Sequence, residues 1–146
     1  MKQTRRRGFS VIELLLVLAI LAVVLALGYA SLQPLMLRSR VNEAATVVAT
    51  SLQRARSFAQ RSNQPAQWKL ISADSFRLDL GGNSYDTTLP SGLTITHPAV
   101  GSQITYSPPY GEVSAVATQI TISGYGYEAD VRVVGVTGKV IRSNVR

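Results

Sequence analysis

The stretch RRRGFSVIELLLVLAI, residues 5–20, places one carboxylate, Glu13, inside a run otherwise suited to a lipid bilayer. From Val11 to Leu32 the chain has 22 residues, of which only Glu13 and Ser31 are clearly polar. About 20 apolar residues are enough for a helix to cross the hydrocarbon core of a membrane. An ionisable side chain in such a segment is energetically costly, so Glu13 is a candidate functional residue.

The remainder of the 146-residue chain has the composition of one modest β domain. Residues 63–146 are rich in Gly, Pro, Ser, Thr and Tyr, the residues typical of strands and turns. The chain has no cysteine, which excludes disulfide bonds, thiol catalysis and thiolate metal sites.

The positive charge of the chain is unevenly distributed. The formal net charge is +7 and the isoelectric point is near 10.3, but four of the 15 basic residues precede Gly8. Residues 63–146 carry six basic and six acidic residues and are neutral as a whole. The overall isoelectric point is therefore poor evidence for a nucleic-acid partner, and only local patches bear on that question.

A basic stub before an apolar run is compatible with a secretory signal, a membrane anchor or a filament-type leader. The run is longer than an ordinary signal core and continues through GYASLQP, residues 28–34, into a helical pattern, although YAS resembles a weak cleavage site. Basic residues before the run outnumber Arg38 and Arg40 after it, which predicts a cytoplasmic N-terminus and an external C-terminal part.

The segment RRRGFSVIELLLVLAILAVV, residues 5–24, resembles the class III leader of type IV pilins and pseudopilins. The resemblance implies that a prepilin peptidase cuts between Gly8 and Phe9 and methylates the new N-terminus at Phe9. Residues 1–8 would then be a cleaved leader and residues 9–33 a transmembrane segment. Gly8, Phe9 and a glutamate four residues after Phe9, here Glu13, all match the family's motif.

The resemblance offers a physical role for Glu13. Cleavage leaves a free ammonium on Phe9 in an apolar environment, and Glu13 lies one helical turn away with the opposite charge. In the family, the glutamate of an incoming subunit is understood to meet the N-terminal amine of the subunit before it, which sets the register of assembly. The alternative is that Glu13 lies near enough to the membrane surface to reach water.

Residues 34–64 predict an amphipathic continuation of this helix. Its polar face carries arginines, which we expect to be solvated. The helix should end in QRSNQP, where Asn63 and Pro65 are breakers, and should be bent or locally unwound near Gly28 and Pro34. The apolar positions recur at steps of three and four and are expected to pack on the head: Val41, Ala44, Ala45, Val48, Leu52, Ala55 and Ala59.

Residues 65–146 predict an antiparallel β head of seven or eight short strands, separated by turns that include GGNSYD, PSG, PPYGE and VTGK. Gly111 and Gly138 are expected to take positive φ in two hairpin turns of similar sequence. This half resembles the pseudopilin H/FimT family, which has a terminal hairpin motif here read as GKVIR, residues 138–142. The expected fold is therefore α+β, a long N-terminal helix packed on two small antiparallel sheets.

The sequence offers no catalytic site and implies no cofactor. The single His97 cannot form a histidine metal cluster and is expected at the surface end of a strand. No nucleophile, zinc or phosphate-binding motif is present. The carboxylate pairs Asp79 with Asp86 and Glu128 with Asp130 are expected to be solvated, so an enzyme is not predicted.

The C-terminus carries a local basic patch that could bind double-stranded DNA. Arg132, Lys139, Arg142 and Arg146 are accompanied by no acidic residue in the last fifteen positions. Lys139 and Arg142 should face opposite sides of a strand, whereas Arg142 and Arg146 would share a face if the strand continued. Binding through Lys139, Arg142 and Arg146 would be weak, salt-dependent and independent of sequence. A basic tail without a partner is the alternative.

These features together predict a minor pilin or pseudopilin near the tip of a type IV pilus or a type II secretion pseudopilus. Its expected partners are the prepilin peptidase, the helices of other subunits and the bacterial inner membrane, before it enters a periplasmic or surface filament. Two alternatives stay open. One is a DNA-uptake subunit that uses the basic tail, as some FimT-like pilins do, and the other is a single-pass anchored β domain that never leaves the membrane.

Overall fold

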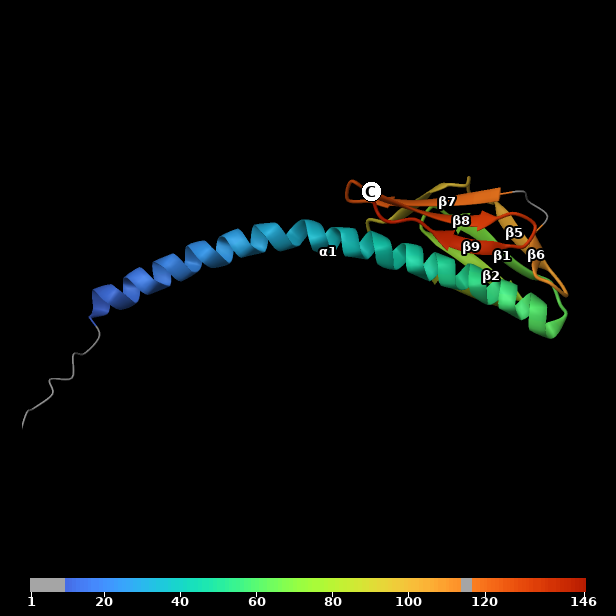
Figure 1. The fold of residues 1–146 in the computed structure, drawn as a ribbon, viewed down its shortest axis with the longest axis horizontal. Helices are drawn as coiled ribbons and strands as arrows, with labels where there is room; N and C mark the ends of the chain where they lie inside the picture. The colour runs from blue at the N-terminus through green and yellow to red at the C-terminus, as the bar shows by residue number, and fades with distance from the viewer. Residues whose placement is uncertain (1–9, 114–116) are drawn as a thin grey trace, which may run out of the picture. The chain divides into compact units, whose positions relative to one another are not determined.

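The computed structural model describes residues 10–113 and 117–146 and contains one helix followed by nine strands (Figure 1). The helix, α1, runs from Val11 to Ser62. The chain divides into two compact units, one that ends at Met36 and one from Leu37 to Arg146. The helix contributes residues to both units, which are described separately below.

The first unit contains α1 as far as Met36. Every large apolar side chain described between Val11 and Met36 is at least half exposed. The helix is unbroken at Gly28 and Pro34, so the local unwinding suggested by the sequence as one option does not occur. Among the described residues, no helix has the length and apolar character that crossing a membrane requires.

In the second unit, α1 buries the apolar stripe predicted from its spacing. All seven predicted positions, Val41 to Ala59, have 1% or less of their surface exposed. Five of the buried helix residues are alanines, which lets the backbone of α1 approach its neighbours closely. The helix ends at Ser62 as predicted, and Asn63 follows it with a φ of 52°, the left-handed conformation common after helix ends.

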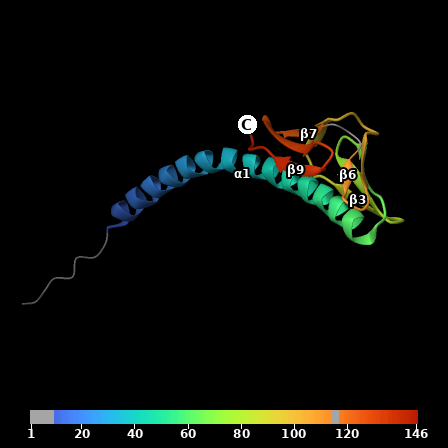
Figure 2. The same ribbon diagram turned by 45° about the vertical axis from the view of Figure 1, so that its right-hand side comes forward.

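The strands form two antiparallel sheets that lie on one side of α1 in the second unit (Figures 1 and 2). The five-stranded sheet has the order β3-β2-β1-β5-β6, and the four-stranded sheet has the order β4-β7-β8-β9. In chain order the strands are β1 Ala66–Ser72, β2 Ser75–Leu80, β3 Asn83–Thr88, β4 Thr94–His97, β5 Gln103–Ser107, β6 Glu112–Val113, β7 Ala117–Gly124, β8 Tyr127–Val134 and β9 Lys139–Arg142.

One continuous core joins the helix and both sheets. Trp68 on β1 stacks on Phe76 on β2, with ring centroids 5.3 Å apart, and Tyr106 on β5 is fully buried in the same cluster. The four-stranded sheet contributes Ile120 and Val131 to this core. The predicted α+β architecture, with a helix packed on two antiparallel sheets, is confirmed.

The prediction of a turn at GGNSYD was wrong for most of that segment. Only Gly81 and Gly82 form the turn, both with positive φ, and Asn83 onward is strand β3. The two-residue glycine loop pairs Leu80 with Asn83, a hairpin geometry that glycine favours. Strand β3 is an exposed edge and therefore has no alternation of apolar side chains. Its sequence resembles that of a loop for this reason.

The two similar hairpins predicted around Gly111 and Gly138 pack against each other. Both glycines have positive φ, 67° and 62°, as predicted. A Cβ on Gly138 would lie 2.8 Å from the carbonyl oxygen of Gly111 and 2.9 Å from the Tyr106 ring. The amide of Val113 also donates to the carbonyl of Val136 at 3.0 Å, so the hairpins join the two sheets.

Candidate functional site

The start of α1 carries the residue singled out by the sequence, Glu13. Gly8 and Phe9 lie outside the described residues. Ser10 caps the helix, because its hydroxyl accepts the amide of Ile12 at 3.2 Å and its carbonyl accepts the amides of Glu13 and Leu14 at 3.1 and 3.2 Å. Serine at the cap with glutamate three residues later is the capping-box pattern.

Besides the expected pairing with an N-terminal amine, Glu13 has a favourable position in the first turn of the helix. A carboxylate in the first turn of a helix is stabilised by the positive end of the helix dipole. The sequence contained this signal, but the leader motif overlaps it and it was missed. The carboxylate therefore favours the start of the helix.

The C-terminal tail continues the four-stranded sheet beyond β9. The amide of Ser143 donates to the carbonyl of Asp130 at 2.8 Å. The amides of Arg146 and Glu128 donate to each other's carbonyls, both at 2.9 Å. The side chain of Val145 is 9% exposed, so the tail is a packed part of the head.

Arg146 at the end of this tail lies beside two carboxylates. Its guanidinium is 3.4 Å from Asp130 and 3.6 Å from Glu128. Asp130 is only 3% exposed, and its carboxylate also accepts the hydroxyl of Thr121 at 2.8 Å. The expectation that Asp130 would be solvated was therefore wrong, because the tail folds over it.

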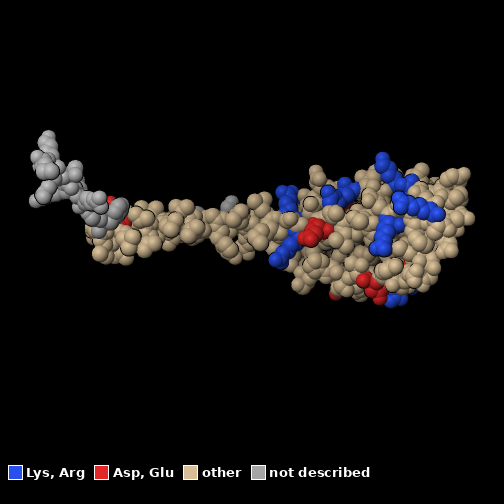
Figure 3. All heavy atoms as spheres, turned by 90° about the horizontal axis from the view of Figure 1, so that it is seen from below, with Lys and Arg blue, Asp and Glu red and all other residues tan. Residues whose placement is uncertain are grey.

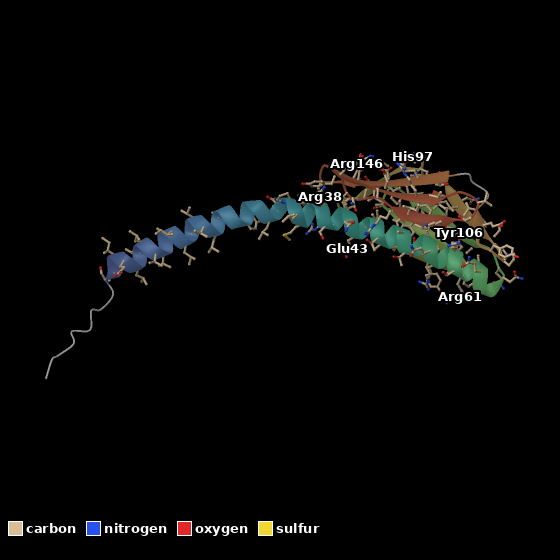
Figure 4. All side chains as sticks on the ribbon, viewed as in Figure 1. Arg38, Glu43, Arg61, His97, Tyr106 and Arg146 are labelled. Carbon is tan, nitrogen blue, oxygen red and sulfur yellow. The ribbon has the colours of Figure 1, made fainter. Side chains whose placement is uncertain are left out.

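Two further arginines fasten the tail and its hairpin to α1. The Arg38 guanidinium donates to the carbonyl of Val145 at 2.8 Å, and Arg142 donates to the hydroxyl of Thr46. Figure 4 shows Arg38 and Arg146 toward the same end of the head, with Arg61 at the other. Arg38 is therefore held by the tail, which the prediction of a solvated arginine face did not anticipate.

The three residues predicted to bind DNA do not form one patch. Lys139 pairs with Val134 and lies on the outward face of the sheet, and Arg142 pairs with the buried Val131 on the face toward α1. This confirms that Lys139 and Arg142 face opposite sides. Arg146 forms ion pairs with two carboxylates. Of the three predicted residues, only Lys139 is exposed and makes no hydrogen bond or ion pair with the described residues.

The remaining candidates for chemistry lie apart. His97 is exposed at the end of β4, as predicted. Asp86 forms a two-bond ion pair with Arg77 at 2.6 and 2.8 Å, while Asp79 accepts the hydroxyl of Ser84. Within residues 10–113 and 117–146, no three His, Asp or Glu side chains gather where they could hold a metal ion.

Two buried polar atoms, the Tyr106 hydroxyl and the Arg56 Nε, belong to side chains that lie against the glycine hairpins. Burial raises the pKa of the Tyr106 hydroxyl well above its usual range, and the nearby positive charge of Arg56 opposes that rise. Neither the Tyr106 hydroxyl nor the Arg56 Nε has a hydrogen-bond partner in the described part of the chain. Tyr106 is fully buried and is a packing residue.

Comparisons with known proteins agree with the N-terminal sequence motif and with the fold described above. Residues 3–29 match the prokaryotic N-terminal methylation motif, a range that contains Gly8, Phe9 and Glu13. The fold is similar to the crystal structure of the type IV minor pilin FimU of Pseudomonas aeruginosa, with a TM-score of 0.60 and 15% sequence identity. The match covers 73% of this chain and 90% of that chain. No curated protein matches the chain.

The motif and the fold are independent observations. The first depends on the N-terminal sequence, and the second depends on the arrangement of a helix and two antiparallel sheets. Together they show a prokaryotic N-terminal methylation motif at the start of a chain whose fold is similar to that of a type IV minor pilin.

Proposed function

We propose that this protein is a minor pilin, a structural subunit of a type IV pilus or a related secretion pseudopilus. The observation that carries the proposal is the coincidence of a methylation motif over residues 3–29 with a helix whose apolar side chains are exposed from Val11 to Met36. A helix that is apolar on all sides is typical of a segment buried by a membrane or by other proteins. In a filament, the packed helices of neighbouring subunits would cover these apolar side chains.

The proposal assigns the leader residues their roles. Cleavage between Gly8 and Phe9 leaves Ser10 and the first turn of α1 in the mature chain. The new ammonium on Phe9 and the carboxylate of Glu13 would be unfavourable if each were buried alone in an apolar filament. Pairing of Glu13 with the amine of a neighbouring subunit satisfies both charges and fixes the register between helices.

Mass spectrometry of the membrane-extracted protein tests processing. We expect a mature chain that begins at a methylated Phe9, and a Gly8→Val variant that keeps residues 1–8. An intact leader on the wild-type protein would contradict the filament proposal and favour the single-pass anchored domain.

Assembly is tested separately with Glu13. Glu13→Gln keeps the size of the side chain but removes the charge, so we expect normal cleavage and loss from the sheared filament fraction. Ser10→Ala is the matched control in the same turn, since it removes the cap without changing the charge. Normal incorporation of Glu13→Gln would exclude the charge-pairing role.

Binding of DNA through Lys139, Arg142 and Arg146 remains a prediction. Its test is a titration of double-stranded DNA with the fragment from Arg38 to Arg146 at low and physiological salt. If the tail is the site, binding weakens with salt and is lost when the three residues are changed to alanine. Because Arg142 and Arg146 hold the tail in place, Lys139→Ala alone is needed beside the triple variant.

A further inference from the structure

Strand β3 is an open edge of the five-stranded sheet. Among the described residues it pairs only with β2, from Asn83 with Leu80 to Thr88 with Ser75. An edge strand presents a row of backbone N–H and C=O groups to any chain that lies beside it. Five of the six side chains of β3 are exposed, so side chains of the head do not cover this strand.

A groove follows the boundary between β3 and α1. It consists of two adjoining hollows of about 300 and 320 Å³ that share Arg54 and Tyr85. Phe76 and Leu78 line the first hollow together with hydroxyl side chains of α1, and Leu80 and Phe58 line the second. We call this feature the β3 groove. Its lining combines apolar side chains with hydroxyl groups and two arginines, which suits the alternating side chains of an extended peptide.

The β3 groove is positively charged. The Arg54 guanidinium lies 5.1 Å from the centre of the Tyr85 ring, and Arg61 lines the second hollow. Among the residues that the structure describes, no acidic side chain lines either hollow. Figure 3, which views the molecule from below, shows several patches of Lys and Arg on that face of the head. A segment docked here would gain by carrying negative charge.

We propose that an extended acidic segment of another protein docks along β3, adds a strand to the sheet edge and places side chains in the β3 groove. A second copy of this head would offer its own β3, whose single acidic residue, Asp86, is already paired with Arg77, so it does not supply an acidic segment. The site does not depend on the filament proposal, since it uses residues of the head alone.

The first test measures the binding of a fluorescein-labelled peptide of alternating aspartate and valine to the full chain in detergent micelles. We expect saturable binding by fluorescence anisotropy that weakens as salt is raised. A double variant, Arg54→Glu with Arg61→Glu, should weaken binding about tenfold or more, equivalent to at least about 1.4 kcal/mol. The matched control, Arg40→Glu with Arg132→Glu, changes the net charge equally at exposed positions outside the groove and should keep the affinity within about threefold.

The second test examines the backbone pairing. Two peptides of the same sequence are N-methylated, one on its odd residues and the other on its even residues. Each therefore lacks the backbone N–H donors along one edge of the extended peptide. At least one of them should bind about tenfold more weakly, and the unmodified peptide should slow amide exchange in β3. Circular dichroism of each variant confirms that the head is folded.

Several results would overturn the proposal. They are equal binding of a lysine–valine peptide, equal loss in the groove and control variants, and full binding of both N-methylated peptides. Binding of a twelve-residue oligo-dT that is lost in the Arg54 variant, with no binding of the peptide, would assign the groove to nucleic acid instead. The leader processing described above is unaffected by any of these outcomes, so the two proposals fail separately.

Discussion

The two parts of α1 are both apolar, but they present their apolar side chains in opposite ways. Up to Met36 the helix is built of large residues such as Leu16 and Val23, which are 59% and 61% exposed. From Val41 to Ala59 the buried residues are mostly small, and they occupy one stripe. One continuous helix therefore contains a segment that completes its packing within the chain and a segment that does not.

The difference teaches that helix formation and helix burial are separate properties. Propensity and the cap at Ser10 favour helix in the first part, where no tertiary contact is needed. In the second part the buried residues occupy one stripe, and most of the other positions are polar. Substitutions in the two parts should therefore have unequal effects on the unfolding of the head.

The largest expected contrast is between Leu52→Ala and Leu16→Ala. Leu52 is fully buried, so its truncation should lower the free energy of unfolding of the head by about 2–5 kcal/mol. Leu16 is exposed in the other unit, and its truncation should leave that free energy unchanged. Urea unfolding in micelles, followed by the fluorescence of Trp68, the chain's one tryptophan, measures both. Similar losses for the two variants would mean that the first part of α1 also packs on the head.

A second contrast uses three glycines. Gly138→Ala should destabilise the head by about 1–3 kcal/mol, because its φ is 62° and the new Cβ would press on Gly111 and Tyr106. At Gly126, where φ is 82° and a Cβ would meet no atom within 4 Å, only the backbone cost applies, about 1–2 kcal/mol. Gly28→Ala in the first part of α1 has neither penalty.

The ranking of these three variants tests the close packing of the hairpins. Thermal melts in the same micelles should give the order Gly28→Ala, Gly126→Ala and Gly138→Ala, from most to least stable. If Gly126→Ala and Gly138→Ala melted together, the contact between the two hairpins would contribute nothing beyond the backbone conformation.

The sequence predicted those elements whose burial follows a local period. The stripe of α1 and the strands QITYS and SFRLDL were identified because one face of each is buried by its neighbours. Strand β3 was missed for the opposite reason. Its pairing depends on backbone groups and on β2, so its polar side chains carry no periodic signal.

Only part of the candidate site was predicted, for a related reason: local motifs are visible in a sequence, and contacts between distant residues are not. Glu13 was recognisable because its motif lies within a few residues of sequence. The bonds of Arg142 to Thr46 and of Arg38 to Val145 join residues 96 and 107 positions apart, and no pattern in the chain indicates them. The basic tail therefore resembled a free patch in sequence, although the fold uses two of its three cations as internal contacts.

A third prediction concerns this tail. Asp130→Asn leaves the shape of the buried side chain but removes the charge that faces Arg146, so the free energy of unfolding should fall by about 1–2 kcal/mol. Glu128→Gln, which faces the same guanidinium from an exposed position, should cost less than about 0.5 kcal/mol. Urea unfolding at neutral pH compares them. Equal effects would show that burial of Asp130 does not strengthen its contact.

The smallest expected effect is at the polar edge of the head. The Arg77 guanidinium donates to Asp86 and holds the pKa of that carboxyl below its ordinary value of 3.8. Because the pKa is lower in the folded state, the pair stabilises the head above pH 3.8, and this contribution is lost as pH falls through the folded pKa. The urea midpoints of the wild type and Asp86→Asn should therefore differ slightly at neutral pH and converge in acid.

Asp79→Asn on the same strand pair, which lacks an ion pair in the described residues, controls for the loss of a charge. A difference between wild type and Asp86→Asn that persisted unchanged in acid would locate the effect in the side-chain shape.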